Sequence, residues 1–261
     1  MFCQINGRCY LERENMEKIY CIIGATSEIG MAYMRKINEQ NEKSTILAIH
    51  FGGKDELEKL NQELKNVTMD YIQCDLSKAE DVAKAIESIK EKYGTPTHFL
   101  HLAARKFEYV KFSKFNWENV LCDLEIQVHS FAEFMKAFLP MMAKQKYGKV
   151  VAMLSSVTKG VPPKYLAGYT LTKYALLGLI NSLVAEYKEK GITINAVSPT
   201  MVETRFLSNI DECIVEMTAV NSGMKRNVKI DEVVGAIEYL MSDKAEYING
   251  LNLPLTGGDI L

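Results

Sequence analysis

A phenol and an ammonium group stand four residues apart at Tyr169 and Lys173, in the segment Tyr-Thr-Leu-Thr-Lys. On a helix this spacing places both side chains on one face, so that they can line one cleft. A free tyrosine has a pKa of about 10, and a neighbouring ammonium lowers that pKa toward the range in which proton transfer is efficient. The pair therefore indicates a proton-transfer site. A tyrosine and a lysine at this spacing also occur by chance, so the interpretation depends on the surrounding sequence.

Two adjacent serines, Ser155 and Ser156, follow an apolar run at 150–154 that is typical of a strand. Ser156 lies thirteen residues before Tyr169. A hydroxyl there could bond a substrate carbonyl and stabilise the negative charge that develops on its oxygen. Ser155 is the alternative for this role, and a plain turn at the end of the strand is the alternative reading of both serines.

A glycine turn follows the first apolar run, with Gly24 and Gly30 on either side of Ala-Thr-Ser-Glu-Ile. Glycine permits a tight turn close to a ligand, and the start of the next helix offers free N–H groups and a partial positive charge. The order of strand, turn and helix predicts a site for the pyrophosphate of a dinucleotide. Its candidate residues are Gly24, Thr26, Ser27, Glu28, Ile29 and Gly30. Two glycines alone are also typical of an ordinary turn.

The segment about twenty residues further on indicates which dinucleotide binds. NAD enzymes place an acid there against the ribose 2′-hydroxyl, whereas His-Phe-Gly-Gly at 50–53 contains none. Asp55 is better read as a helix cap. Lys54 could contact a 2′-phosphate, or it could be a solvated surface charge. We therefore expect NADP(H) as the cofactor, with NAD(H) less favoured.

Strand-like and helix-like runs alternate along the chain, which is typical of a parallel sheet covered on both faces. We predict an α/β fold, a single doubly wound Rossmann-type domain over 16–261 with a mostly parallel sheet of about seven strands, after a flexible N-terminal tail at 1–15. The segment 204–223 shows no clear periodicity. Strands are expected at 18–23, 45–50, 69–74, 98–103, 150–154, 191–197 and 250–253. Helices are expected at 28–38, 55–65, 78–92 with Ser77 as its cap, 116–144 with Pro140 as a bend, 169–188 and 230–242.

The bulk composition excludes several classes of function. The chain has 261 residues and a net charge of -2, so no basic excess argues for a nucleic acid or an anionic membrane as partner. No apolar run approaches the roughly 20 residues that a bilayer requires. The six cysteines are scattered without a C-x-x-C pair. We expect no metal site and a reducing, cytoplasmic setting.

In type, order and spacing these motifs resemble those of the short-chain dehydrogenase/reductase family, over 19–258, with most similarity to the 3-oxoacyl-acyl-carrier-protein reductases. The pair Tyr169 and Lys173, with a serine thirteen residues earlier, matches the catalytic set of that family. The glycine turn resembles its T-G-x-x-x-G-x-G motif, with Ile23 in place of the usual threonine and Glu28 in place of the middle glycine.

The resemblance implies further site residues. Tyr169 and Lys173 would contact the cofactor as well as act in catalysis, and Gln127 would hold the water that family members bind with an asparagine of the long helix. A buried structural glutamine is the alternative there, and a plain turn residue is the alternative for Asp75. The remaining positions that match cofactor contacts of the family are Asp75, Leu76, Ala103, Ala104, Pro199, Val202 and Thr204.

The resemblance also implies an activity, the interconversion of a ketone and a secondary alcohol by hydride transfer with Tyr169 as general acid or base. The substrate would be a small carbonyl or alcohol compound, free or carrier-bound, and 201–224 would form either an apolar lid over it or a helix packed on the core. A homotetramer or homodimer is implied. The alternative is a protein of this fold with weak or lost catalysis that acts as a binding or assembly subunit, suggested by the departures at Glu28, Ala104, Gln127 and Thr200.

Overall fold

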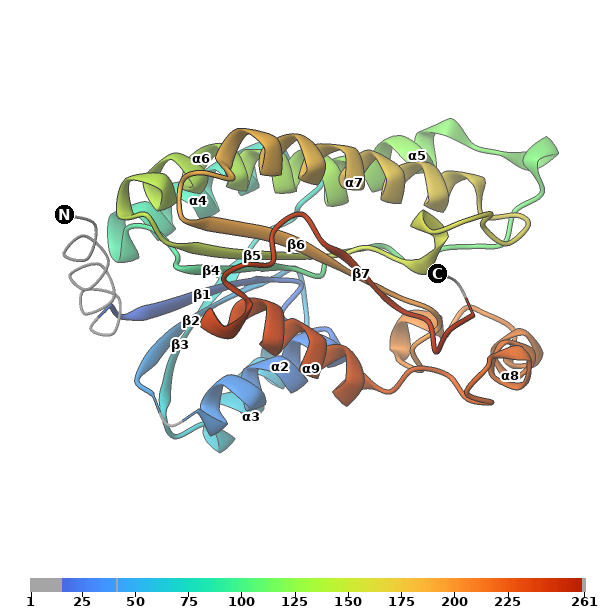
Figure 1. Cartoon of the computed structure of the whole chain (residues 1–261), viewed down its shortest axis with the longest axis horizontal. Coiled ribbons are helices and arrows are strands. Elements are labelled where there is room, and N and C mark those ends of the chain that lie inside the picture. The colour runs from blue at the N-terminus through green and yellow to red at the C-terminus, as the bar shows by residue number, and fades with distance from the viewer. Residues whose placement is uncertain (1–15, 41, 260–261) are drawn as a thin grey trace.

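A computed structural model describes residues 16–40 and 42–259, and it contains a seven-stranded sheet of order β3-β2-β1-β4-β5-β6-β7 (Figure 1). All neighbouring strands are parallel, so the predicted fold class is confirmed. The tail predicted at 1–15 lies outside the described residues, and the domain boundary at 16 stays a prediction. The strands are β1 Lys18–Ile23, β2 Ser44–His50, β3 Val67–Gln73, β4 His98–His101, β5 Gly148–Met153, β6 Ile192–Pro199 and β7 Asn252–Leu255.

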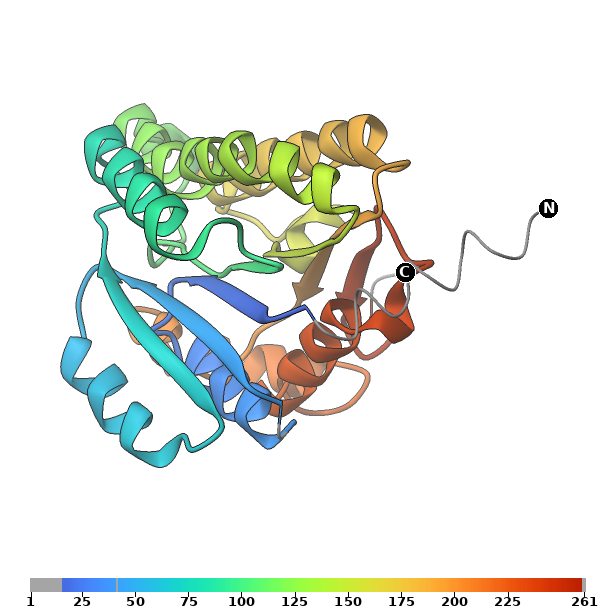
Figure 2. The same cartoon turned by 90° about the vertical axis from the view of Figure 1, so that its left-hand side faces the viewer.

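Helices cover both faces of the sheet (Figure 2). Helices α2, α3 and α9 lie on one face, and α4, α5, α6 and α7 lie on the other (Figure 1). No helix of the described segments is both long and apolar enough to cross a bilayer. The helices are α2 Glu28–Glu39, α3 Lys54–Glu63, α4 Ala79–Tyr93, α5 Trp117–Leu124, α6 Ser130–Gln145, α7 Ala167–Tyr187, α8 Glu212–Asn221 and α9 Ile230–Met241.

The two helical layers bury alternate residues of each strand, because successive strand side chains point to opposite faces. In β1, Tyr20 and Ile22 pack in the core beneath α2 and α9. Cys21 and Ile23 pack in the core beneath α4 and α6. Burial on both faces explains why the strands are nearly continuous apolar runs in the sequence.

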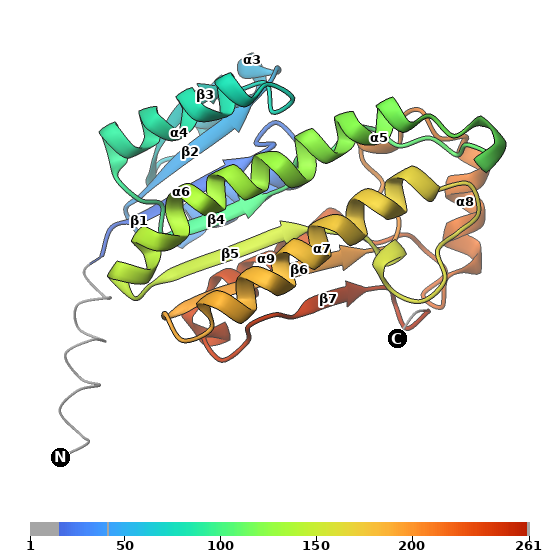
Figure 3. The same ribbon diagram turned by 90° about the horizontal axis from the view of Figure 1, so that it is seen from above.

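The strand order reverses between β1 and β4, and this reversal positions the site. The chain runs outward from β1 to β3 and then returns to place β4 on the other side of β1. In such sheets the loops at the carboxyl ends diverge at the reversal and leave a crevice for a ligand. Helix α8 and the loop that precedes it lie beyond the carboxyl ends of the strands (Figure 3).

Two helix predictions were wrong in detail. Ser77 does not cap α4, since Lys78 is the N-cap residue and the Ser77 hydroxyl instead donates to Asp75 Oδ1 at 2.6 Å. The helix expected at 116–144 is interrupted at a π-helical turn, Glu125–His129, and continues through Pro140 as α6. The segment that showed no periodicity contains a short 3₁₀ helix, Arg205–Leu207, followed by α8.

Candidate active site

A large cavity of about 1750 Å³ opens at the carboxyl edge of the sheet. Loops that follow each of β1 to β6 contribute to its lining. This is more than the few hundred Å³ of a typical small-ligand pocket, so a dinucleotide and a substrate can share it. The cavity brings together every site residue predicted from the sequence except Gly30, Lys54 and Gln127.

The glycine turn after β1 has the conformation that a diphosphate site requires. Gly24 has φ +79°, and a Cβ there would lie 3.0 Å from the backbone nitrogen of Ala103. Ser27 caps α2, since its Oγ accepts from Gly30 N at 3.1 Å and donates to Gly24 O at 2.8 Å. The first N–H groups of a helix lack acceptors within the helix, so they are available to an anion at this end. The turn therefore fits a pyrophosphate, with Gly30 in a packing role.

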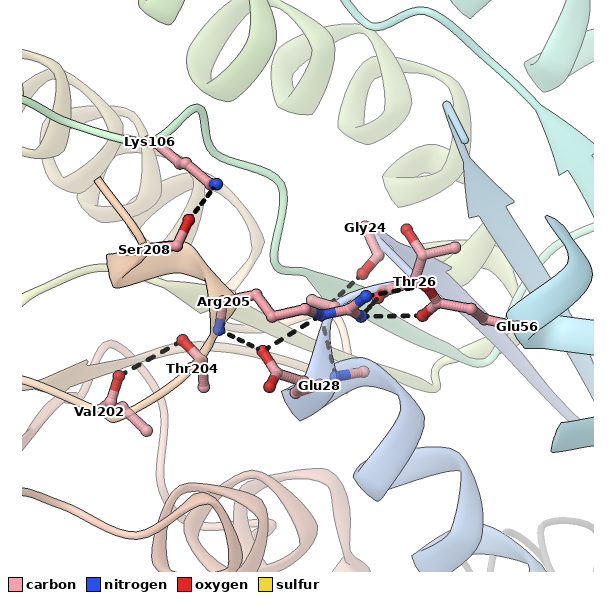
Figure 4. A network of polar contacts seen from close by, with 11 residues as sticks. Gly24, Thr26, Glu28, Glu56, Lys106, Val202, Thr204, Arg205 and Ser208 are labelled. Carbon is pink, nitrogen blue, oxygen red and sulfur yellow. Dashed lines mark hydrogen bonds and ion pairs between the residues drawn. The ribbon is translucent and has the colours of Figure 1, made fainter. Parts of the chain in front are cut away.

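The side chain of Glu28 binds the loop after β6. Its Oε2 accepts a hydrogen bond of 2.7 Å from the backbone N–H of Arg205 (Figure 4). Its place in the first turn of α2 also suits the positive end of the helix dipole. The acid that replaces the usual glycine thus ties α2 to the loop after β6.

Lys54, which was expected to contact a 2′-phosphate, does not face the cavity. Lys54 Nζ pairs with Glu58 Oε1 at 3.2 Å along α3, and Lys54 is not among the described residues that line the cavity. Glu56, one turn into α3, does line it. Asp75 lies at this end as predicted, and the hydrogen bond from Ser77 holds the pKa of its carboxyl below the usual range.

The first turns of α7 position the predicted proton-transfer pair. Tyr169 and Lys173 both face the cavity, as their helical spacing predicted. Lys173 is 2% exposed, and its Nζ donates to the carbonyl of Met153 at 2.9 Å and lies 5.6 Å from the centre of the Tyr169 ring. The carbonyl at the end of β5 therefore fixes the lysine beside the phenol.

Loss of solvation favours the neutral form of both side chains, so it raises the pKa of Tyr169 and lowers that of Lys173. The pKa of Tyr169 is raised to about 12, mainly by burial, although a hydrogen bond with Ser155 lowers it. The pKa of Lys173 is lowered to about 7, again mainly by burial, against an opposing effect of Asp123. The expected lowering of the tyrosine pKa by an ammonium is therefore not seen, since loss of solvation outweighs the charge.

The low pKa of Lys173 predicts how stability varies with pH. In the unfolded chain the amine keeps a proton up to about pH 10.5, whereas in the folded protein it loses it near 7. The unfolded state then binds more protons between these values, so the unfolding free energy rises with pH. We expect Lys173 to contribute a rise of about 2 kcal/mol between pH 7 and pH 9, which Lys173→Met should remove.

Urea unfolding of wild type and variant across this pH range measures the effect. Lys136→Met, which replaces an exposed lysine of α6, is the matched control and should keep the wild-type slope. An unchanged slope in Lys173→Met would show that the buried amine stays charged.

The two serines are both at the cavity, but they differ in their contact with Tyr169. The hydrogen bond that lowers the pKa of Tyr169 comes from the side chain of Ser155. Ser155 Oγ also accepts from Val157 N at 3.4 Å and caps the 3₁₀ helix Ser156–Thr158. The effect on the pKa of Tyr169 favours Ser155 as the partner of the phenol, while sequence spacing favours Ser156; the role of each serine stays a prediction.

Behind the lysine lie two polar side chains of the interrupted helix, one buried and one half-buried. Gln127, in the π-helical turn, is 1% exposed, and its Oε1 has no hydrogen-bond partner in the described structure. The same holds for Asp123 Oδ1, four residues earlier and 3.8 Å from Arg105 Nε. Unpaired buried atoms are costly and are commonly satisfied by ordered water. The water-holding role of Gln127 stays a prediction, and Asp123 is a further polar residue here that the sequence analysis missed.

Phe107, an aromatic residue that the sequence analysis also missed, packs against Tyr169. The Phe107 ring centre lies 4.7 Å from that of Tyr169 and 5.7 Å from that of Phe206. Asn209 Nδ2 donates to the Phe107 carbonyl at 2.8 Å, and the Lys106 ammonium donates to the Ser208 hydroxyl. The loops after β4 and β6 thus close together over the phenol. In the segment 201–224, which was expected to form a lid or a helix packed on the core, Phe206, Leu207 and Met217 line the cavity.

Comparison with known proteins agrees with this geometry. A family model described as enoyl-(acyl carrier protein) reductase matches residues 24–259. Dehydrogenase/reductase SDR family member 4 of Rattus norvegicus is 30% identical, over 95% of this chain and 90% of its own. The 3-oxoacyl-[acyl-carrier-protein] reductase FabG of Staphylococcus epidermidis is 23% identical, over 93% and 99%. The gluconate 5-dehydrogenase of Burkholderia cenocepacia, solved with NADP and tartrate, superposes with a TM-score of 0.82 at 20% identity, over 95% and 98%.

The family model spans nearly the whole described fold, from the glycine turn after β1 to the segment after β7. The rat relative covers the same fold at 30% identity. The chain belongs to the short-chain dehydrogenase/reductase family.

Proposed function

We propose that this protein is an NADP(H)-dependent oxidoreductase that interconverts a ketone and a secondary alcohol, with Tyr169 as the general acid or base. Oxidoreductases that bind nicotinamide cofactors make up its family. One observation carries the proposal: a turn suited to a pyrophosphate and a pair formed by a half-buried tyrosine and a buried lysine open into the same cavity. A binding subunit without catalysis would not require that arrangement.

The lining of the cavity divides into parts that would hold a dinucleotide. The turn from Gly24 to Ile29 would bind the pyrophosphate, and Asp75 and Leu76 would contact the adenine. The loops after β4 and β6 would enclose the nicotinamide half through Ala103, Ala104, Pro199, Val202 and Thr204. When bound, the nicotinamide would supply or accept the hydride.

Side chains of this protein would donate and resupply the proton of the reaction. With a pKa raised to about 12, Tyr169 stays protonated at neutral pH, so it can give its proton to a carbonyl oxygen as that oxygen gains negative charge. A serine hydroxyl donates a second hydrogen bond to the same oxygen. Lys173, with a pKa near 7, can return a proton to the phenol from the buried polar groups behind it.

The aromatic cover of Tyr169 favours a substrate with an apolar body. Phe107, Tyr109 and Phe206 surround the space above the phenol, and Ile214 and Met217 of α8 face it. Such walls do not satisfy the hydroxyls of a sugar. A free cyclic ketone fits them, and so does a carrier-bound 3-oxoacyl thioester, for which Lys164 at the cavity supplies a positive charge.

Exposed apolar side chains on α5 and α7 support a homo-oligomer. Trp117 and Leu121 are 51% and 47% exposed on α5, and Leu171 and Tyr174 are 37% and 44% exposed on α7. These two helices contact one another. Contiguous exposed apolar groups commonly mark an interface, and we propose a homotetramer or homodimer built on this face.

Fluorescence titration of the purified protein with NADPH and with NADH tests the proposed cofactor. We expect NADPH to bind at micromolar concentrations and at least about tenfold more tightly than NADH, a difference of about 1.4 kcal/mol. Adenosine triphosphate, which carries phosphates without nicotinamide, is the control ligand. Tighter binding of NADH would contradict the NADP(H) preference, and binding of neither dinucleotide would favour a non-catalytic role.

A further inference from the structure

Arg205 has no role in the function described above, although its side chain enters the dinucleotide end of the cavity. It begins the 3₁₀ helix after β6, far in sequence from the glycine turn. Its guanidinium donates to both carboxylate oxygens of Glu56 at 2.8 Å and to the Thr26 carbonyl at 3.2 Å (Figure 4). Arg205 therefore joins the loop after β6 to the glycine turn and to α3.

The charges around Arg205 present a problem for a dinucleotide. Glu28 and Glu56 both line the cavity beside the glycine turn. Two carboxylates near a diphosphate repel it. Arg205 pairs with both acids, at 2.8 Å from Glu56 and 3.8 Å from Glu28. Its charge offsets theirs at the place where the phosphates would arrive.

We propose that Arg205 is a phosphate-binding residue of the dinucleotide site, supplied by the loop after β6. The inference rests on the proposed function. The guanidinium has five N–H donors, and the hydrogen bonds described above engage three of them. The others are available to a phosphate oxygen. An arginine suits this task because its fork of donors matches phosphate in a bidentate geometry.

The energetics of the ion pair allow the guanidinium to move. The side chain of Arg205 is 56% exposed and that of Glu56 is 41% exposed. Exposed ion pairs contribute about 0–1 kcal/mol, so a dianionic phosphate can draw the guanidinium from Glu56 at small cost. The backbone N–H of Arg205 remains bound to Glu28, which keeps the arginine at the glycine turn while its side chain turns toward the ligand.

Equilibrium titration of wild type and Arg205→Met with NADPH and with NADH tests the inference without relying on turnover. We expect the variant to bind more weakly by about tenfold to hundredfold, the range for a hydrogen bond between charged groups. A loss confined to NADPH assigns the contact to the 2′-phosphate, and an equal loss for both dinucleotides assigns it to the pyrophosphate. Both outcomes support a phosphate contact.

Three further variants sharpen the result. Arg35→Met removes an exposed arginine that pairs with Glu63 outside the cavity, and it should bind as wild type does. Lys54→Met tests the competing sequence-based assignment of the 2′-phosphate contact. Adding Glu28→Gln and Glu56→Gln to Arg205→Met should restore part of the affinity, because the repelling charges are gone.

The outcomes separate this inference from the proposed function. If Arg205→Met is folded by circular dichroism and binds both dinucleotides as wild type does, the inference is wrong and the proposed function stands. If Lys54→Met alone loses affinity for NADPH, the inference is also wrong. If wild type binds neither dinucleotide, the inference and the proposed function fail together.

Discussion

Replacing Tyr169 with phenylalanine is expected to lower kcat by about 10²–10⁴-fold, the usual contribution of a positioned proton donor. The change removes one oxygen and leaves the ring that packs against Phe107 at 4.7 Å between centres. Hydride delivery to a carbonyl would then leave an alkoxide without the proton source that the site provides. The affinity for the dinucleotide should change much less, because the glycine turn and the loop after β6 are untouched.

The measurement is steady-state reduction of 1-decalone, an uncharged apolar cyclic ketone, alongside a dinucleotide titration of the same preparation. Tyr187→Phe, at the end of α7 and outside the cavity lining, is the matched control and should keep full activity. Turnover within about threefold of wild type in Tyr169→Phe would assign the proton to another group. Absence of turnover in wild type, with cofactor binding intact, would indicate either a carrier-bound substrate or lost catalysis.

The second large effect is expected at the serines, where sequence spacing and structure favour different residues. We expect Ser155→Ala to lower kcat by about 10²–10³-fold, as loss of one donor to a developing oxyanion does, and Ser156→Ala to lower it by less than about tenfold. The reason is that Ser155 acts on the pKa of Tyr169, which places its hydroxyl beside the oxygen that would receive the phenol proton. The paired variants differ only in which hydroxyl is absent.

A pH profile distinguishes this role from a structural one. The bond from Ser155 lowers the pKa of Tyr169, so its removal raises that pKa further. Alcohol oxidation, which requires the phenolate as base, should then reach its plateau at higher pH in Ser155→Ala than in wild type. The opposite pattern, with the larger loss and the shifted profile in Ser156→Ala, would restore the assignment made from the spacing.

Most helices and strands were predictable because each depends on a pattern of apolar and polar residues within its own segment. Strands buried on both faces appear as apolar runs, and all seven begin and end within two residues of the expectation. The interruption at Glu125–His129 was not predictable, because Pro140 is a stronger local signal than anything in the π-helical turn. The cap at Ser77 failed because a neighbouring acid, Asp75, competed for the same hydroxyl.

The candidate site likewise contains residues that local sequence patterns reveal and residues that they do not. Tyr169 and Lys173 were found because one helical turn fixes their spacing, and the glycine turn was found because strand, turn and helix adjoin in sequence. Phe107, Glu56 and Arg205 were missed because their contacts join loops after different strands, which only the folded sheet brings together. Glu28 is one of the departures that suggest weak or lost catalysis, and the sequence could not show that its carboxylate binds the Arg205 backbone.

The central position of β1 has a consequence for how the chain is made. Its partner on one side, β2, follows directly in sequence, but its partner on the other side, β4, begins only at His98. As the polypeptide leaves the ribosome, the edge of β1 that awaits β4 exposes unpaired backbone groups. Such an open edge can pair with other nascent chains. Chaperone protection of the nascent chain would therefore have to last at least until β4 has been synthesised.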